Sequence, residues 1–411
     1  MSATAYHLRP RRGWLNDPNG MVFRDGRWHV FFQHNPQAPR HDRICWGHVS
    51  SIDLIRWDEH PVAFGPTPDG PDSFGCWSGV YVAGLDRPAV VYSGVTDAAG
   101  ASTVCLRWGG EDLVTWSEPV VVAEPPSVDG VQVMRDPFVF NHGGRRWALL
   151  GAGLEAGCAA AILYSCDDIT QWRYEGVFAS ARDAGLAAAG PADVWECAQL
   201  EQLPDGSAAL VLSLHDRGVL GQVVGCLGRI ITDGAGRPRF AAVRGSDAVQ
   251  VLDHGNAYYA PQVAQDPDGG WVMGWVREEA QDAADHAGCM TLPRRLVVEG
   301  QRLRLVLDPR LRSGLALGPP EPITDGVELS GAWHILAAGP GAGLLHDTFG
   351  TLALAPGAEV WGDGTVVEVY PTGGAPSTWR HDRPWRLRGQ AGAVRLRRVL
   401  SVGQPAGSDA P

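Results

Sequence analysis

A turn followed by a short apolar strand recurs along this chain at nearly constant spacing. The residues that open these strands are about 61, 58, 61 and 63 positions apart, and they are Trp28, Ala89, Trp147, Ala208 and Trp271. Self-similarity at a fixed period, built from strands and turns without helical periodicity, is typical of a β-propeller. The sequence therefore predicts an all-β fold with a five-bladed β-propeller over residues 1–310. A generic sandwich with accidental spacing is the alternative.

A second marker has the same period in the first three units. It has the form Asp-apolar-x-x-Trp and begins at Asp53, Asp112 and Asp168. The pattern stops near residue 311, although residues 331–398 still consist of strands and turns. We therefore expect a small C-terminal β-sandwich over residues 311–400. Small and polar residues at 401–411 predict a flexible tail.

Composition excludes several classes of partner. The formal net charge of −12 disfavours nucleic acid, which binds basic surfaces. No apolar run reaches the roughly 20 residues of a membrane span, and the N-terminus has no apolar signal segment. Eight cysteines without a CxxC pair suggest neither zinc nor a disulfide framework. We expect a cytoplasmic protein with no membrane partner; nothing in the sequence specifies its oligomeric state.

Three acidic residues occupy equivalent positions in three of the repeats. Asp17 and Asp136 each lie 11 residues before their markers Trp28 and Trp147, and Glu196 lies 12 before its own. Equivalent positions in a propeller are related by rotation about its axis, so these acids should converge on one pocket.

The local sequences fit chemistry, although each also has a structural explanation. Asp17 precedes a proline, which favours extended backbone, and alone it fits an ordinary Asx turn. Asp136 follows Arg135, as a buried ion pair would. Glu196 stands between a tryptophan and a cysteine, surroundings that raise the pKa of a carboxyl group by desolvation, as a general acid requires.

These motifs resemble the three signatures of glycoside hydrolase family 32, which includes invertases, levanases, inulinases and fructosyltransferases. The resemblance rests on Trp-x-Asn-Asp-Pro-Asn-Gly at 14–20, Arg-Asp-Pro at 135–137 and Glu-Cys at 196–197. It extends through Trp-Gly-His at 46–48, Trp-Ser-Gly at 77–79 and Tyr-Ala-Pro-Gln at 259–262. It implies a five-bladed propeller with a C-terminal sandwich, in agreement with the repeat count.

The resemblance also implies roles for individual residues. Asp17 would be the nucleophile, Glu196 the acid/base and Asp136 a transition-state stabiliser in retaining hydrolysis of β-D-fructofuranosides such as sucrose or short fructo-oligosaccharides. Hydrogen bonds to fructose are expected from Asn16, Gln33, Ser78 and Arg135, an apolar wall from Trp46 and Trp77, and further substrate contacts from Asp253 and Tyr259. No metal or cofactor is expected.

Two departures from the family pattern lie where the leaving group is expected. Ala198-Gln199 replaces the usual Pro-Asp after Glu-Cys, and Ala257 stands where an acid is common. A fructosyltransferase and an exo-levanase or exo-inulinase therefore stay as alternatives. An inverting five-bladed furanosidase is disfavoured by the intact Asn-Asp-Pro-Asn-Gly. A non-catalytic sugar-binding propeller would be expected to lack at least one of the three acids.

Overall fold

The computed structural model describes residues 6–243, 248–278, 285–389 and 392–400. The tail expected at 401–411 lies outside these residues. The described chain is built from β-sheets whose strands are antiparallel except for one parallel pair, with one short α-helix, α1 (Pro309–Gly314), and one 3₁₀ turn, η1 (Ala187–Ala189). The prediction of an all-β fold is confirmed. No helix in the described ranges is long and apolar enough to cross a bilayer.

The first three sheets each consist of consecutive antiparallel strands. The first contains β1 (Gly13–Arg24), β2 (Arg27–Asn35), β3 (Cys45–Ser51) and β4 (Asp58–Glu59). The second contains β5 (Gly75–Tyr81), β6 (Ala89–Val95), β7 (Ser102–Trp108) and β8 (Val120–Ala123). The third contains β9 (Val131–His142), β10 (Arg145–Leu154), β11 (Cys158–Ser165) and β12 (Arg173–Ser180).

Two further sheets complete a ring. The fourth contains β13 (Val194–Gln202), β14 (Ala208–Asp216), β15 (Val219–Thr232), β16 (Pro238–Ala242) and β17 (Val249–Val251). The fifth contains β18 (Tyr258–Asp266), β19 (Gly269–Val276), β21 (Cys289–Met290), β22 (Arg294–Glu299) and β23 (Arg302–Leu307). β20 (His286–Ala287), which lies between β19 and β21 in the chain, pairs in parallel with β1. This pairing joins the last unit of the ring to the first sheet.

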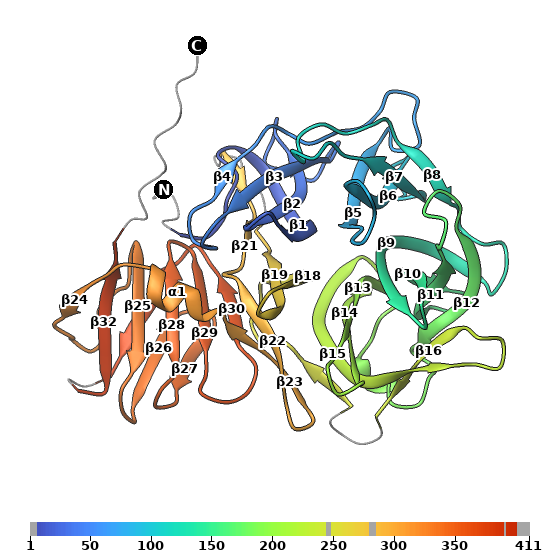
Figure 1. Ribbon diagram of the computed structural model, residues 1–411. Helices are drawn as coiled ribbons and strands as arrows, with labels where there is room; N and C mark the ends of the chain where they lie inside the picture. The colour runs from blue at the N-terminus through green and yellow to red at the C-terminus, as the bar shows by residue number, and fades with distance from the viewer. Residues whose placement is uncertain (1–5, 244–247, 279–284, 390–391, 401–411) are drawn as a thin grey trace, which may run out of the picture.

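The first strand of each sheet faces the centre of the ring (Figure 1). These inner strands are β1, β5, β9, β13 and β18; each contacts the next, and β18 contacts β1. Apolar side chains fill the spaces between neighbouring sheets, as in the cluster of Trp147, Leu149, Trp195 and Leu210 between the third and fourth. Side chains on the inner strands therefore meet at a common axis.

The Asp-apolar-x-x-Trp marker is a turn after the third strand of a sheet. Asp53 Oδ1 accepts the backbone N–H groups of Ile55 and Arg56 at 2.9 and 2.8 Å. Asp112 and Asp168 cap the same turn in the next two sheets. The Asp-apolar-x-x-Trp marker is thus an Asx turn. Its short carboxylate accepts hydrogen bonds from N–H groups that the turning chain leaves free.

The C-terminal part consists of two packed sheets (Figure 1, orange and red). One has the order β24 (Leu317–Glu321), β32 (Val394–Val399), β25 (Ala332–Ala337), β28 (Glu359–Asp363), β29 (Val366–Tyr370) and β30 (Ser377–Arg380). The other has the order β27 (Gly350–Leu354), β26 (Ala342–His346) and β31 (Arg386–Arg388). Buried residues such as Trp333, Ile335 and Leu344 form the core between them.

Candidate active site

Every inner strand has a bulge at the same height. Two residues on the inner strand face one residue of its partner, which bends the strand and re-aims its side chains. The bulged pairs are Asn16–Asp17, Trp77–Ser78, Asp136–Pro137, Cys197–Ala198 and Ala260–Pro261. Asp136, Cys197 and Ala260 have φ of 58°, 47° and 45°, a conformation that costs about 1–3 kcal/mol for residues with a Cβ atom. The bulges bring the two bulged acids, and Glu196 beside the fourth bulge, to the axis.

Asp17 is held by side chains of the first two sheets. Its Oδ2 accepts hydrogen bonds from Ser78 Oγ at 2.6 Å and Gln33 Nε2 at 3.1 Å. Its Oδ1 accepts Asn16 Nδ2 at 3.1 Å. Burial raises the pKa of Asp17 to about 6, even though the hydrogen bond from Ser78 lowers it, and the charge of Glu196 adds to the rise. Asp17 is thus a carboxylate with neutral donors, and among the described residues no cation is bonded to it.

Asp136 lies deeper, with only 6% of its surface exposed. Its Oδ2 accepts the backbone N–H of Cys197 at 3.0 Å, and its own N–H donates to Ser93 Oγ at 2.7 Å. Burial is the main cause that raises its pKa to about 7; Arg135 lowers the pKa and Glu196 raises it. A backbone donor of the fourth sheet therefore binds this carboxyl group, and a side-chain acceptor of the second sheet fixes the backbone of Asp136.

Glu196 is held by two side chains from other sheets. Tyr259 Oη donates to Glu196 Oε2 at 2.7 Å, and Arg135 Nη2 lies 3.0 Å from Oε1. A Cβ atom at Gly151 would lie 2.2 Å from the carbonyl oxygen of Trp195, so only glycine permits β10 to approach β13 at this point. The glutamate is therefore fixed by contacts on both sides of its strand.

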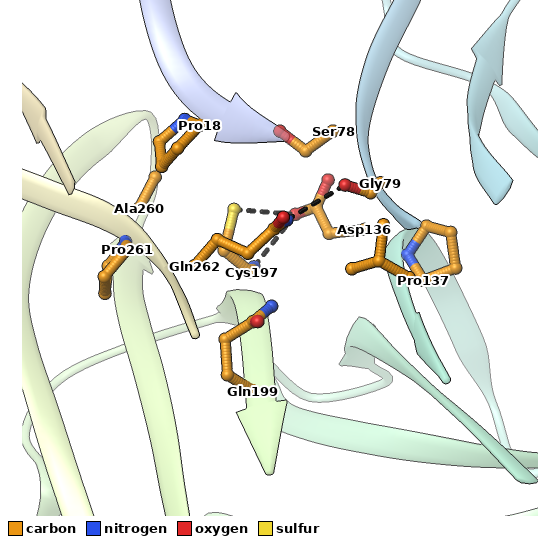
Figure 2. Close-up of a pocket in the computed structure, with 11 residues that line it drawn as sticks. Pro18, Ser78, Gly79, Asp136, Pro137, Cys197, Gln199, Ala260, Pro261 and Gln262 are labelled. Carbon is orange, nitrogen blue, oxygen red and sulfur yellow. Dashed lines mark hydrogen bonds between the residues drawn. The ribbon is translucent and has the colours of Figure 1, made fainter. Parts of the chain in front are cut away.

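Cys197 links the other two acids, a contact that the motif alone did not reveal. Its Sγ lies 3.6 Å from Asp17 Oδ2 and 3.7 Å from Asp136 Oδ2. A small hollow adjoins this point and is lined by residues from all five inner strands (Figure 2). Among them are Pro18, Ser78, Asp136, Cys197 and Ala260. The acid cluster, defined as Asp17, Asp136 and Glu196, therefore lies beside the axis of the ring.

The structure places most of the other expected site residues around this cluster. Asn16, Gln33, Ser78, Arg135 and Tyr259 each contact one of its acids, as given above. Trp77 is half-buried and its ring lies 5.4 Å from that of His41, whose Nε2 is 3.3 Å from Gln33 Oε1. His41 was not foreseen from the sequence, because it stands in a loop without a marker.

Two expected substrate contacts are corrected by the structure. Trp46 is 0% exposed and packs among Phe31, Phe64 and Tyr92, so it offers no surface to a sugar; its indole N–H supports the Trp77 carbonyl at 3.1 Å. Asp253 is buried in an ion pair with Arg294 at 2.8 Å and has no contact with the acid cluster. Its carboxylate is fully used by internal donors.

One group in the described ranges has the composition of a metal site. The ring nitrogens of His29, His48 and His60 lie within 4.8 Å of one another. His29 Nδ1 and His48 Nε2 are 3.0 Å apart, and the rings of His48 and His60 are stacked at 4.3 Å with a 24° interplanar angle. Lone pairs of stacked rings lie in nearly parallel planes and do not converge on one ion. This group is a stack within the first sheet, apart from the acid cluster.

Comparison with known proteins agrees with this geometry. The glycosyl hydrolases family 32 N-terminal domain matches residues 7–309. The sucrose-6-phosphate hydrolase of Bacillus subtilis (strain 168) is 33% identical over 315 residues, which cover 72% of this chain and 63% of that protein. The raffinose invertase of Escherichia coli is 30% identical over 323 residues, with the same coverage. The chain thus spans less than two thirds of the length of these relatives.

Solved structures share the fold across nearly the whole chain. The sucrose-6-phosphate hydrolase of Lactobacillus gasseri superposes with a TM-score of 0.78 at 21% identity, covering 97% of this chain and 93% of that one. The family 32 β-fructofuranosidase BmSUC1 of Bombyx mori gives 0.75 at 21% identity, covering 98% and 95%. These neighbours have a β-propeller followed by a β-sandwich. The chain belongs to glycosyl hydrolase family 32.

Proposed function

We propose that this chain is a retaining β-fructofuranosidase that hydrolyses β-D-fructofuranosides. The observation that supports this most strongly is the meeting of Asp17, Asp136 and Glu196 from three different sheets. Cys197 lies against two of these acids, and Arg135 and Tyr259 hold the third. A sugar-binding protein without activity has no need of three acids at one point, two of them with a raised pKa.

The chemistry assigned to these residues has two steps. Glu196 donates a proton to the glycosidic oxygen while Asp17 attacks C2 of fructose, which forms a fructosyl ester and releases the second sugar. Glu196 then takes a proton from water, which attacks C2 and releases fructose with retained configuration. Asp136 binds fructose hydroxyl groups and stabilises the positive charge on the ring. Retention requires the Asp17 and Glu196 carboxyl groups to be about 5–5.5 Å apart.

Asn16, Gln33, Ser78 and Arg135 would bind the fructose unit, with Trp77 as its apolar wall and Tyr259 toward the leaving group. Sucrose and short fructo-oligosaccharides are the proposed substrates. A second candidate substrate is a phosphorylated disaccharide, because relatives of this chain are named sucrose-6-phosphate hydrolases. Fructosyl transfer would use the same two steps with a sugar in place of water.

The organisation of the chain is part of this proposal. The five sheets of the ring would be the blades of a five-bladed propeller over residues 1–310, and residues 311–400 a β-sandwich domain. All eight cysteines are free thiols, which supports a reducing compartment such as the cytoplasm.

Product analysis tests the proposed function. We expect purified protein to release fructose from sucrose, sucrose 6-phosphate or levanbiose faster than from inulin or levan. Proton NMR at early times should show β-fructofuranose as the first product, because two displacements retain configuration. Release of the α-anomer would contradict the covalent mechanism, and no release from any of these five fructosides would contradict the activity.

A further inference from the structure

The C-terminal sandwich holds one segment of the ring by the edge of its sheet. β30 is one of the two edge strands of the six-stranded sheet, and its free backbone groups are covered by residues 253–257, here called the 253–257 segment. The Thr378 N–H donates to Asp253 Oδ1 at 2.8 Å, the Ala257 N–H donates to the Thr378 carbonyl at 3.1 Å, and the Arg380 N–H donates to Asn256 Oδ1 at 3.1 Å. An exposed strand edge normally needs such a cover, and here the cover comes from the ring.

The 253–257 segment and β30 are in such close contact that they cannot shift past each other. A Cβ atom at Gly255 would lie 1.8 Å from the carbonyl oxygen of Thr378, so the backbones touch at this residue. Thr378 Oγ1 donates to Asp253 Oδ2 at 2.6 Å and accepts from Arg294 Nη2 at 2.6 Å. Both side chains that bind this hydroxyl group are fully buried. One hydroxyl group of the sandwich therefore fixes the start of the segment.

The end of the 253–257 segment leads directly into the acid cluster. Ala257 is followed by Tyr258 and then by Tyr259, whose hydroxyl group donates to Glu196 Oε2. Arg277 ties the segment from the other side: its N–H and Nη2 donate to the carbonyl oxygens of Ala257 and Asn256 at 2.8 and 2.6 Å. Its guanidinium carbon lies 5.6 Å from the centre of the Tyr259 ring.

We propose that Thr378 of the sandwich is a positioning residue, which holds the 253–257 segment so that Tyr259 binds the acid/base Glu196. The inference rests on the proposed function for the role of Glu196. It gives the sandwich a part in the protonation step, although none of the sandwich residues that the structure describes contacts the acid cluster. An interface that only stabilises the fold would predict something different: a lower melting temperature with equal effects on all substrates.

Leaving groups separate the two explanations. An aryl leaving group departs from a fructoside with little help from an acid, whereas a sugar alkoxide needs a proton in order to leave. Thr378→Val should lower the rate constant of fructosylation by the alkoxide substrate about tenfold or more. It should leave that of the aryl fructoside, measured as the initial burst of phenol release, within about twofold. Tyr259→Phe should show the same selective loss, and Thr378→Ser, which keeps the hydroxyl group, should restore the wild-type ratio.

Thr372→Val is the matched control, because the Thr372 hydroxyl group donates to the Pro356 carbonyl at 2.8 Å within the sandwich. It should change neither rate. Crystal structures of the wild type and Thr378→Val add a readout that needs no activity: the separation of Tyr259 Oη and Glu196 Oε2 should leave hydrogen-bonding range in the variant. An equal loss on both substrates, or an intact Tyr259–Glu196 hydrogen bond, would overturn the inference. Failure of the wild type to release fructose would instead overturn the proposed function and leave the crystallographic comparison to judge Thr378.

Discussion

Two regions of this molecule each hold three carboxyl groups, and they differ in how much positive charge surrounds those groups. The acid cluster contains three carboxyl groups and one bonded guanidinium, Arg135. The junction network, defined as His7, Asp253, Arg294, Asp363 and Glu368, contains three carboxyl groups and two cations where the sandwich meets the ring. All three carboxyl groups of the junction network are buried; in the acid cluster Asp136 is buried and Asp17 and Glu196 are partly exposed. The supply of positive charge differs.

The pKa values follow that difference. Burial raises the pKa of Asp17 to about 6. Burial would also raise that of Glu368, but the charge of Arg294 and a hydrogen bond to His7 outweigh it and hold the pKa at about 2. For His7, burial lowers the pKa, and hydrogen bonds with Asp363 and Glu368 raise it to about 9. Carboxylates matched by cations build structure, and carboxylates short of cations are available for chemistry.

Of the variants that test this comparison, Asp17→Asn should have the largest effect on activity. The substitution removes the proposed nucleophile and keeps the size of the side chain and its neutral donors. We expect kcat on sucrose to fall about 10⁴-fold or more with unchanged circular dichroism. Asp112→Asn, in an exposed turn, should keep full activity. Retention of more than a tenth of the wild-type kcat by Asp17→Asn would remove Asp17 from the nucleophile role.

The acid/base assignment is tested by leaving-group dependence. Glu196→Gln cannot donate a proton, so kcat for fructosylation by an alkoxide substrate should fall about 10²–10⁴-fold. A fructoside with an acidic phenol as leaving group should lose far less, and stopped-flow release of the phenol measures this step directly. Equal losses on both substrates would mean that another carboxyl group protonates the leaving oxygen.

The sequence predicts a feature of this site where that feature has a sequence signal that recurs with the repeat. The positions of Asp17, Asp136 and Glu196 follow it, because rotation about the axis maps one repeat onto the next. The bulges that aim the side chains recur in every inner strand, but they share no sequence signal. Nothing in Cys197–Ala198 marks a two-residue bulge; Pro137 and Pro261 are the nearest signals, as proline is tolerated there.

Asp253 illustrates the other limit. It lies six residues before Tyr259, and from the sequence it was expected to bind substrate. Its partners include Thr378, which lies 125 residues away in the C-terminal sandwich, and no repeat or motif relates the two positions. Trp46 was misplaced for a related reason: a motif gives the neighbourhood of a residue but not whether its ring faces the axis or the core.

The junction network is tested through stability. Arg294→Met leaves Asp253 without its cation and Glu368 with His7 alone, in a fully buried position, so the free energy of unfolding should fall by about 3–5 kcal/mol. Arg312→Met, which breaks the exposed ion pair with Glu359, should cost about 0–1 kcal/mol. Urea denaturation at pH 7 measures both. Equal losses in the two variants would mean that the junction is not a matched charge network.

The finest test uses the pH dependence of stability in the acid cluster. The folded pKa of Asp17 is about 6, above the ordinary value of 3.8, so the folded protein keeps a proton that the unfolded chain releases between these values. Its contribution to stability is therefore present below pH 3.8, declines as pH rises toward 6, and stays lost above that. An asparagine does not titrate. Asp17→Asn should gain stability relative to the wild type as pH rises from 4.5 to 7.5, by about 1–3 kcal/mol.

Urea midpoints at intervals of about half a pH unit, converted to free energies, measure this gain. Asp112→Asn is the control with the opposite sign, because hydrogen bonds from the Val114 and Thr115 N–H groups lower the pKa of Asp112. Its variant should lose stability relative to the wild type as pH rises through the acidic range and gain nothing near pH 6. If the difference between Asp17→Asn and the wild type is constant with pH, the burial of Asp17 does not disfavour its charge. The contrast between acid cluster and junction network would then rest on geometry alone.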